Sequence, residues 1–150
     1  MDNQKQITTL NELIETTIDS ITGYEDSAKN IDNERLREIF RERADERQQI
    51  VQELRSEVRR LGGDPEQSGT FLGKTHQRFE DLKAAITGRD EKSIINEVER
   101  GEDYLKSKWE AALNGDLTGE SRSIVERCYQ SVRSGHDQIS QLKHGMESNT

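Results

Sequence analysis

Glu102 is the residue of this sequence whose chemistry most needs an explanation. It lies in the helical stretch Asn96 to Trp109, on a stripe that is otherwise apolar. The apolar members of this stripe are Ile95, Val98, Leu105, Trp109 and Ala112. An isolated charge buried among such side chains costs many kcal/mol. Glu102 therefore needs either a cationic side chain as its partner or a metal ion to bind.

Arg47 favours the first alternative. It occupies a core-facing position on another helical segment, and arginine neither loses its proton nor ligates metal. We therefore predict a buried Arg47–Glu102 ion pair, of the kind that often specifies register more than it adds stability. Thr17 and His136 are expected at the same level, with His136 hydrogen-bonded there. The predicted polar core layer comprises Thr17, Arg47, Glu102 and His136.

The second alternative is a di-iron centre, in which iron or another divalent metal is held by carboxylates and histidines from several helices. Its candidate ligands are Glu46, Glu99, Glu102 and His136. The ion pair and the metal centre make opposite demands on Arg47, because its side chain must move away if metal occupies the layer. We expect the ion pair and no cofactor, and the metal centre stays open as the alternative.

The helix rise of about 1.5 Å per residue aligns these residues across the bundle. For this alignment we take the two short turns between helices to lie at the same end. Arg47 is then fourteen residues from Asn33, and Glu102 is twelve residues from Asn114. These separations correspond to roughly 21 and 18 Å, so the two side chains are predicted to meet.

Apolar residues recur every three or four positions along four long segments, which predicts helices. The first segment runs from about Gln4 to Asn30, and the second runs from an N-cap at Asp32 to Leu61. Its seam includes Glu57, whose core position we expect Val58 to take over. Glycine and proline at 62–65 end this helix.

A polar loop at 64–70 and a short amphipathic helix at about 71–87 are expected next. Asp90 is the expected N-cap of the following helix, which continues to Leu113, and the last helix covers 120–145. Residues 147–150 are expected to be a frayed tail. The sequence thus predicts a single all-α domain over 1–150. Its predicted fold is an antiparallel four-helix bundle with a short extra helix in the crossover between the second and third long helices.

Specific phrases add to this pattern: GYEDSA at 23–28, ADERQQIVQEL at 44–54, LGGDPEQSG at 61–69, EVERGED at 97–103 and GHDQI at 135–139. Together they resemble a bacterial family of small ferritin-like four-helix-bundle proteins that is filed as a domain of unknown function. The resemblance implies the ferritin-like fold but no established activity. Metal-binding ferritin-like proteins carry a Glu-x-x-His pair in each hairpin. This chain instead has Ala44-x-x-Arg47 and Arg133-x-x-His136.

Composition and charge indicate which partners and which cellular location to expect. The net charge is -8 with acids and bases interleaved, and without a basic stripe we expect no nucleic-acid partner. Apolar runs of at most three residues predict no membrane span. Cys128 is the only cysteine, and the N-terminus lacks a signal-peptide pattern, so we expect a cytoplasmic protein.

No phosphate loop, nucleophile motif or catalytic acid pair appears in the sequence. We therefore expect a non-enzymatic bundle of unidentified role, and its charged, apolar-poor composition suits a stress-associated protein. One competing hypothesis is a metal-binding protein or oxidase. The other is an interaction module that pairs helices with an unidentified protein or with itself. We expect a homodimer, because the short helix has the large apolar residues Phe71, Leu72 and Phe79.

Overall fold

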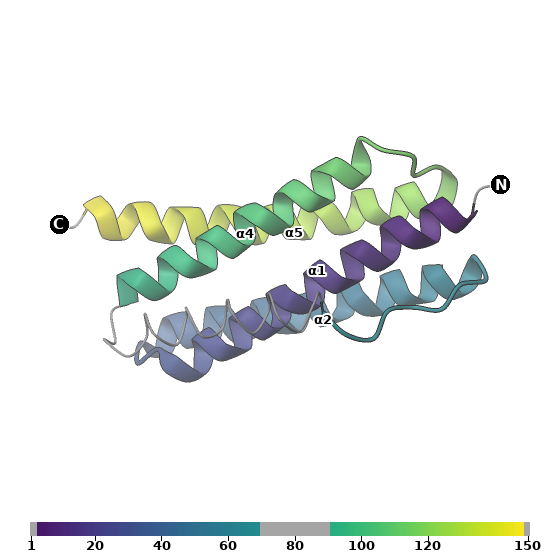
Figure 1. Cartoon of the computed structure of the whole chain (residues 1–150). Coiled ribbons are helices and arrows are strands. Elements are labelled where there is room, and N and C mark those ends of the chain that lie inside the picture. The colour runs from purple at the N-terminus through teal and green to yellow at the C-terminus, as the bar shows by residue number, and fades with distance from the viewer. Residues whose placement is uncertain (1–2, 70–90, 149–150) are drawn as a thin grey trace.

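The computed structural model describes residues 3–69 and 91–148. These residues contain four α-helices: α1 Asn3–Asn30, α2 Glu34–Arg60, α4 Glu91–Leu113 and α5 Gly119–Ser148 (Figure 1). Within the same residues there is no strand, so the all-α prediction is confirmed. The short helix expected at 71–87 and the expected cap Asp90 lie outside the described residues.

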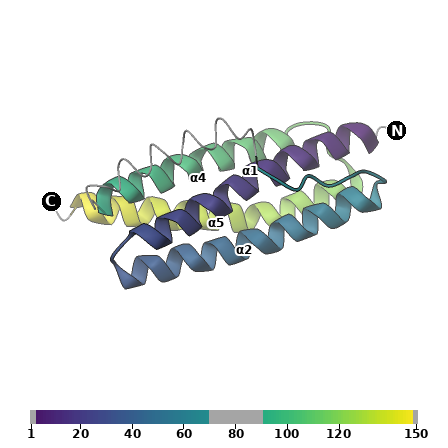
Figure 2. The same ribbon diagram turned by 60° about the horizontal axis from the view of Figure 1, so that its bottom comes forward.

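The helices are arranged as two hairpins that pack side by side. α1 and α2 run in opposite directions, and so do α4 and α5 (Figures 1 and 2). α2 and α4, in contrast, run in the same direction, so that α2 ends at one end of the bundle and α4 begins at the other. Buried apolar side chains from all four helices form one core; its largest members include Trp109, Phe40, Leu10 and Ile139.

The two short turns lie at opposite ends of the bundle, so the prediction that they share one end is wrong. The backbone N–H of Thr118, in the turn between α4 and α5, donates to Gln6 near the start of α1 at 2.9 Å. The turn between α1 and α2 is at the far end. Arg47 and Glu102 still lie at the same level along the bundle, because each is at the middle of its helix. Arg47 is thirteen residues from either end of α2 (34 and 60), and Glu102 is eleven from either end of α4 (91 and 113).

The spacing of apolar residues explains why α1 forms and which face it buries. Its residues at three- and four-residue spacing are buried, and so is Ile31 directly after the helix; the buried positions in the helix are Ile7, Leu10, Ile14, Thr17, Ile21, Tyr24 and Ala28. α2 ends as predicted, since Gly62 adopts a φ of 88°, which glycine reaches without strain. Gly63 N–H donates to the carbonyl of Val58 at 2.9 Å, which closes the C-terminus of the helix.

Three local predictions are corrected. The N-cap of α2 is Asn33 rather than Asp32, because Asn33 has extended backbone angles and its side chain accepts from Leu36 N–H at 3.1 Å. Val58 does not replace Glu57 in the core, since both are buried. α5 is helical through Ser148 and not only to 145, so residues 147 and 148 belong to the helix and not to a frayed tail.

None of the described helices contains a stretch long and apolar enough to cross a membrane.

Candidate functional site

Arg47 and Glu102 form a two-pronged ion pair in the middle of the bundle. Arg47 Nη1 donates to Glu102 Oε1 and Nη2 donates to Oε2, both at 2.8 Å. The exposed fraction is 0 % for Arg47 and 2 % for Glu102. A parallel arrangement of two charge-assisted hydrogen bonds is the strongest geometry available to this pair. It compensates for part of the large cost of removing both charges from water.

Helix α1 supplies the remaining contacts of the guanidinium. Ser20 Oγ accepts a third hydrogen bond from Arg47 Nη1 at 2.6 Å, and the Tyr24 ring lies 5.6 Å from Arg47 Cζ. Arg47 Nε and the Tyr24 hydroxyl are buried without a hydrogen-bond partner. Sequence reasoning missed Ser20, although its position three residues after Thr17 places both on one helix face.

Helix α5 contributes a glycine rather than a polar side chain. A Cβ atom at Gly135 would stand 2.5 Å from Arg47 Nη2 and 3.3 Å from Glu102 Oε2. Only glycine therefore lets the α5 backbone approach the ion pair this closely. The available signal was Gly135 itself, a glycine on an otherwise apolar helical seam, which usually has a packing reason.

Thr17 was predicted in the layer of the ion pair, but its hydrogen-bond partner on α4 is Trp109, seven residues along the helix from Glu102. Its hydroxyl accepts a hydrogen bond from Trp109 Nε1 at 3.3 Å and donates to the carbonyl of Leu13 at 2.6 Å. Both Thr17 and Trp109 have an exposed fraction of 0 %. Thr17 therefore satisfies the indole N–H of a buried tryptophan and joins α1 to α4.

The electrostatics of the cluster favour the charged pair. Burial alone lowers the pKa of Arg47, but the charge and hydrogen bonds of Glu102 raise it by more. Arg47 is therefore held protonated. Burial, followed by the Glu102 charge, raises the pKa of Tyr24 well above its usual value, so this phenol stays neutral.

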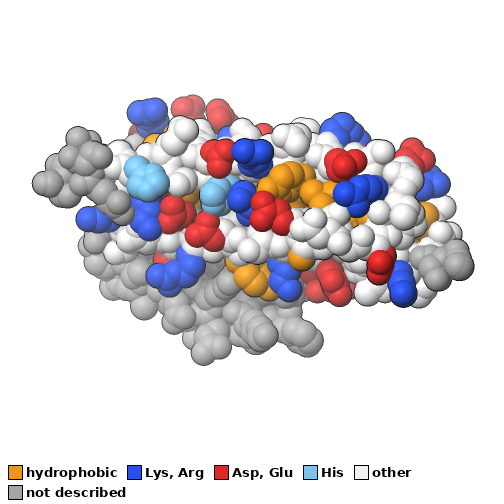
Figure 3. All heavy atoms as spheres, turned by 90° about the horizontal axis from the view of Figure 1, so that it is seen from above, with side chains coloured by type: hydrophobic (Ala, Val, Ile, Leu, Met, Phe, Trp, Pro, Cys, Tyr) orange, Lys and Arg blue, Asp and Glu red, His pale blue; other side chains and the backbone are white. Residues whose placement is uncertain are grey.

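His136 lies outside the ion-pair cluster, at the boundary between α4 and α5. Its Nε2 is 2.6 Å from Asp103 Oδ1, its Nδ1 is 3.2 Å from Asp137 Oδ1, and its side chain is 17 % exposed. Histidine, acidic and basic side chains are interleaved on the face seen in Figure 3. The structure thus pairs Arg47 with Glu102, gives Thr17 a separate contact with Trp109, and places His136 in a surface ion pair.

The four candidate metal ligands do not converge. Glu99 accepts from Lys143 Nζ at 2.8 Å, and Glu46 accepts from Arg43 Nη1 at 2.8 Å and from the Ser131 hydroxyl. Glu102 and His136 have the partners described above. Among residues 3–69 and 91–148, no three His, Cys, Asp or Glu side chains are grouped as metal ligands.

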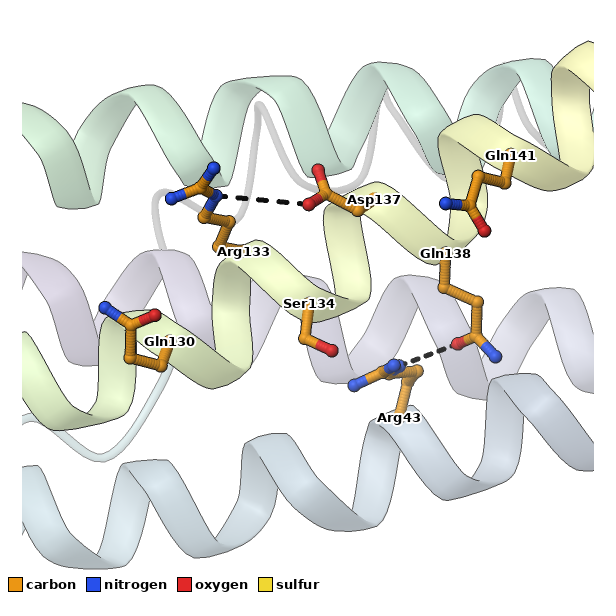
Figure 4. A pocket seen from close by; sticks show the side chains of 7 residues that line it. All are labelled: Arg43, Gln130, Arg133, Ser134, Asp137, Gln138 and Gln141. Carbon is orange, nitrogen blue, oxygen red and sulfur yellow. Dashed lines mark hydrogen bonds and ion pairs between the residues drawn. The ribbon is translucent and has the colours of Figure 1, made fainter.

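An open polar groove runs along α5 and meets α2 at Arg43 (Figure 4). Arg43 Nε donates to Gln138 Oε1 at 2.9 Å, and Arg133 Nε lies 3.9 Å from Asp137. Ser134 points into the space between the two helices (Figure 4). Each arginine of the groove therefore already faces an acceptor, and the groove offers neither a concentrated charge nor an apolar floor to a ligand.

A comparison with curated proteins finds no match to this chain. A family model described as "Domain of unknown function (DUF2383)" matches residues 5–115. This range contains the described parts of α1, α2 and α4 that supply Thr17, Ser20, Arg47 and Glu102, whereas α5 lies beyond it. The match covers most of the 150 residues. The chain therefore belongs to the DUF2383 family, a domain of unknown function.

Proposed function

We propose that this protein is a non-enzymatic, ferritin-like helical bundle in which an ion pair occupies the position where a metal centre would lie. The carrying observation is the buried, two-pronged contact between Arg47 and Glu102, with both hydrogen bonds at 2.8 Å. A fixed positive charge at this position repels a cation and occupies the carboxylate that a metal would need.

The order and direction of the helices support the ferritin-like part of the proposal. Ferritin-like bundles join two helical hairpins through one long crossover. Here α2 ends and α4 begins at opposite ends of the bundle, which agrees with such a connection. The ion pair also lies at the midpoints of α2 and α4, deep between the hairpins.

The partners of the other candidate ligands support the absence of a metal role. Glu99 faces Lys143, Glu46 faces Arg43, and His136 faces Asp103. A metal ion would have to displace Lys143 from Glu99 and Arg43 from Glu46. It would also have to bring together side chains that now lie in separate contacts.

The first experiment is metal analysis of the full chain purified without a histidine tag, followed by titration with ferrous iron. We expect no stoichiometric metal in the protein as isolated and no saturable binding in the titration. Stoichiometric iron that Glu102→Ala abolishes in a folded protein, and that Arg47→Met retains, would overturn the proposal. Glu126→Ala is the matched control, because Glu126 is an exposed glutamate on α5 whose ion-pair partner among the described residues is Arg122 on its own helix.

The cellular part of the proposal is a stress-associated cytoplasmic protein that acts through a protein partner. The buried free thiol of Cys128 agrees with a reducing compartment.

The homodimer is a separate part of the proposal. The residues that motivate it, Phe71, Leu72 and Phe79, lie outside the described residues. Within the described part, the large apolar residue that is most exposed is Tyr104, at 40 %. Sedimentation of the full chain tests the homodimer, and a monomer at high concentration would remove it.

A further inference from the structure

Helix α5 is joined to α2 by donors on α5 and carboxylate acceptors on α2. The acceptors, which we call the α2 row, are Glu46, Glu53 and Glu57. Their respective donors on α5 are Ser131, Cys128 and Ser121. The Cys128 thiol lies 3.0 Å from Glu53, and the Ser121 hydroxyl lies 2.5 Å from Glu57. Arg127 adds a second donor to Glu53 at 2.7 Å.

Helix α4 holds the other side of α5 in the same way. Its acceptors, which we call the α4 row, are Glu99, Asp103 and Glu110. Their respective donors on α5 are Lys143, His136 and Tyr129, at 2.8, 2.6 and 2.5 Å. These donors are seven residues apart, so they lie on one stripe of α5. Six carboxylates on two helices therefore accept from α5.

The contacts of α1 depend less on exposed carboxylates. Trp109 Nε1 donates to the hydroxyl of Thr17, and Arg37 donates to the backbone carbonyls of Ala28 and Ile31 at 3.1 and 2.7 Å. Neutral oxygens accept these bonds and do not titrate near neutral or acidic pH. The attachment of α5 is thus more dependent on ionised carboxylates than the attachment of α1.

We propose that α5 is an acid-releasable helix: protonation of the α2 and α4 rows detaches it from the bundle while α1, α2 and α4 stay packed. Two contacts have the reverse sense, since Gln138 of α5 accepts from Arg43, and Glu120 of α5 lies 3.5 Å from Arg60. They are outnumbered by the contacts in which α5 donates.

The sign of the pH dependence follows from three members of the rows. The hydrogen bond from Arg60 lowers the pKa of Glu57, and the hydrogen bonds from Cys128 and then Arg127 lower the pKa of Glu53. The pKa of Glu110 is lowered by Tyr129 and then by Lys106. A lowered pKa in the folded state contributes stability above the unfolded pKa, and this stability is lost as pH falls through the folded value.

The neighbouring charges leave this sign unchanged. Arg43 faces Glu46, Lys143 faces Glu99, and these bases stay charged in acid. The pKa of His136 is raised, so its imidazole is protonated as pH falls and keeps its contact with Asp103. Apart from His136, acid therefore acts on the acceptors of the rows and not on their donors.

Cys128 provides a direct measure of release, because it is the only cysteine, lies on α5 and is 4 % exposed. Burial and then Glu53 raise its pKa to about 12, so the packed thiol is unreactive. The experiment labels the full chain with a pyridyl disulfide, which reacts with thiols in acid, between about pH 7 and about pH 2.5, so that the range extends below the ordinary carboxyl pKa. Rates are divided by those of the urea-unfolded chain at the same pH.

We expect Cys128 labelling to accelerate at a higher pH than the one at which most of the helical circular dichroism signal is lost. Trp109 fluorescence does not separate the two events, because Trp109 shares one core with α5. Among the three carboxylates with a lowered pKa, Glu57 should contribute most, since its side chain is 2 % exposed and those of Glu53 and Glu110 are 43 % and 45 % exposed. Coincident changes in labelling and circular dichroism would indicate global unfolding and overturn the proposal. Protection of Cys128 down to the lowest pH would do the same.

Charge-neutral variants test the same point at neutral pH. Glu57 and Glu110 accept from Ser121 and Tyr129, so replacing either of them leaves the hydrogen bond of Cys128 in place. Glu57→Gln and Glu110→Gln are each expected to raise the labelling rate of Cys128 several-fold. Glu126→Gln is the control, because its partner Arg122 is on α5 itself. Should Glu57→Gln unfold the chain, Glu110→Gln carries the test, since Glu110 lies at the partly buried α4–α5 boundary. Equal rates in Glu110→Gln and Glu126→Gln would contradict the proposal.

Discussion

Gly135 of α5 lies directly over the guanidinium of Arg47. A Cβ atom at Gly135 would stand 2.5 Å from Arg47 Nη2, closer than real Cβ contacts allow. An arginine at a surface would simply move aside. Arg47 is fully buried and bonded twice to Glu102, so any movement breaks the geometry of the ion pair. The position of Arg47 on one hairpin therefore requires glycine at 135 on the other.

Gly135→Ala is predicted to destabilise the protein. Overpacking of this kind costs about 1–3 kcal/mol, and the helix propensity of alanine offsets at most about 1 kcal/mol of that loss. Gly101→Ala is the matched control, since Gly101 lies inside α4 with no atom within 4 Å of its added Cβ. The control should gain up to about 1 kcal/mol in urea unfolding. Equal stabilities of the two variants would show that Gly135 is not required for close approach.

Removing one partner of the ion pair should cost more than removing both. Arg47→Ala or Glu102→Ala leaves a buried charge unpaired, which costs on the order of 3–5 kcal/mol. The double change Arg47→Met with Glu102→Leu should recover much of that loss, because no charge remains in the core. Urea unfolding of the three variants, with and without added iron, gives the coupling energy. Additive losses together with iron-dependent stability in the parent protein would favour the metal centre instead.

The spacing of apolar residues predicted the helices and the two members of the ion pair. An error in the direction of α4 did no harm, because reversing a helix leaves its midpoint in place, and Glu102 is at the midpoint. His136 could not be placed with the same certainty. It follows Gly135 by one residue, which is a turn of roughly 100° around the helix. That rotation moves its side chain from the core to the α4–α5 boundary, where Asp103 accepts from it.

Gly135 on its seam indicated a packing role, but its contact with Arg47 was beyond prediction for a different reason. Periodicity shows which positions face inward, but the distance between two backbones depends on how the helices pack in three dimensions. Likewise, the row of acceptors around α5 requires α2 and α4 to be on either side of it. A sequence that shows scattered glutamates contains no local signal for that arrangement.

Thr17→Val is predicted to destabilise the protein and to alter the fluorescence of Trp109. The change keeps the shape of the side chain but removes the acceptor of the Trp109 indole N–H, and a buried unsatisfied donor costs about 1–3 kcal/mol. Thr8→Val is the control, since exposed Thr8 donates to the carbonyl of Gln4 on its own helix. Trp109 is the only tryptophan, so its emission reports this contact directly. A Thr17→Val protein as stable as Thr8→Val would exclude a structural role for the hydrogen bond.

His136 should stabilise the α4–α5 hairpin most at low pH. Burial lowers the pKa of His136, but the hydrogen bonds to Asp137 and Asp103 raise it by more, so the net shift is upward. A raised pKa in the folded state gives stability that is fully present below the unfolded pKa, about 6.5, and is lost as pH rises through the folded value. His136→Gln should therefore cost more at about pH 5.5 than at about pH 9 in urea unfolding.

Asp103→Asn tests the same contact from its other side. It removes the charge that attracts the protonated imidazole, so it should abolish most of the extra stability at low pH. This dependence is opposite in sign to that of the carboxylates around α5, whose contribution is lost in acid. A His136→Gln penalty that is constant across the range would mean that the imidazole contributes by packing alone. An upward shift of the His136 pKa in a titration followed by NMR, lost in Asp103→Asn, would connect the stability change to the 2.6 Å contact.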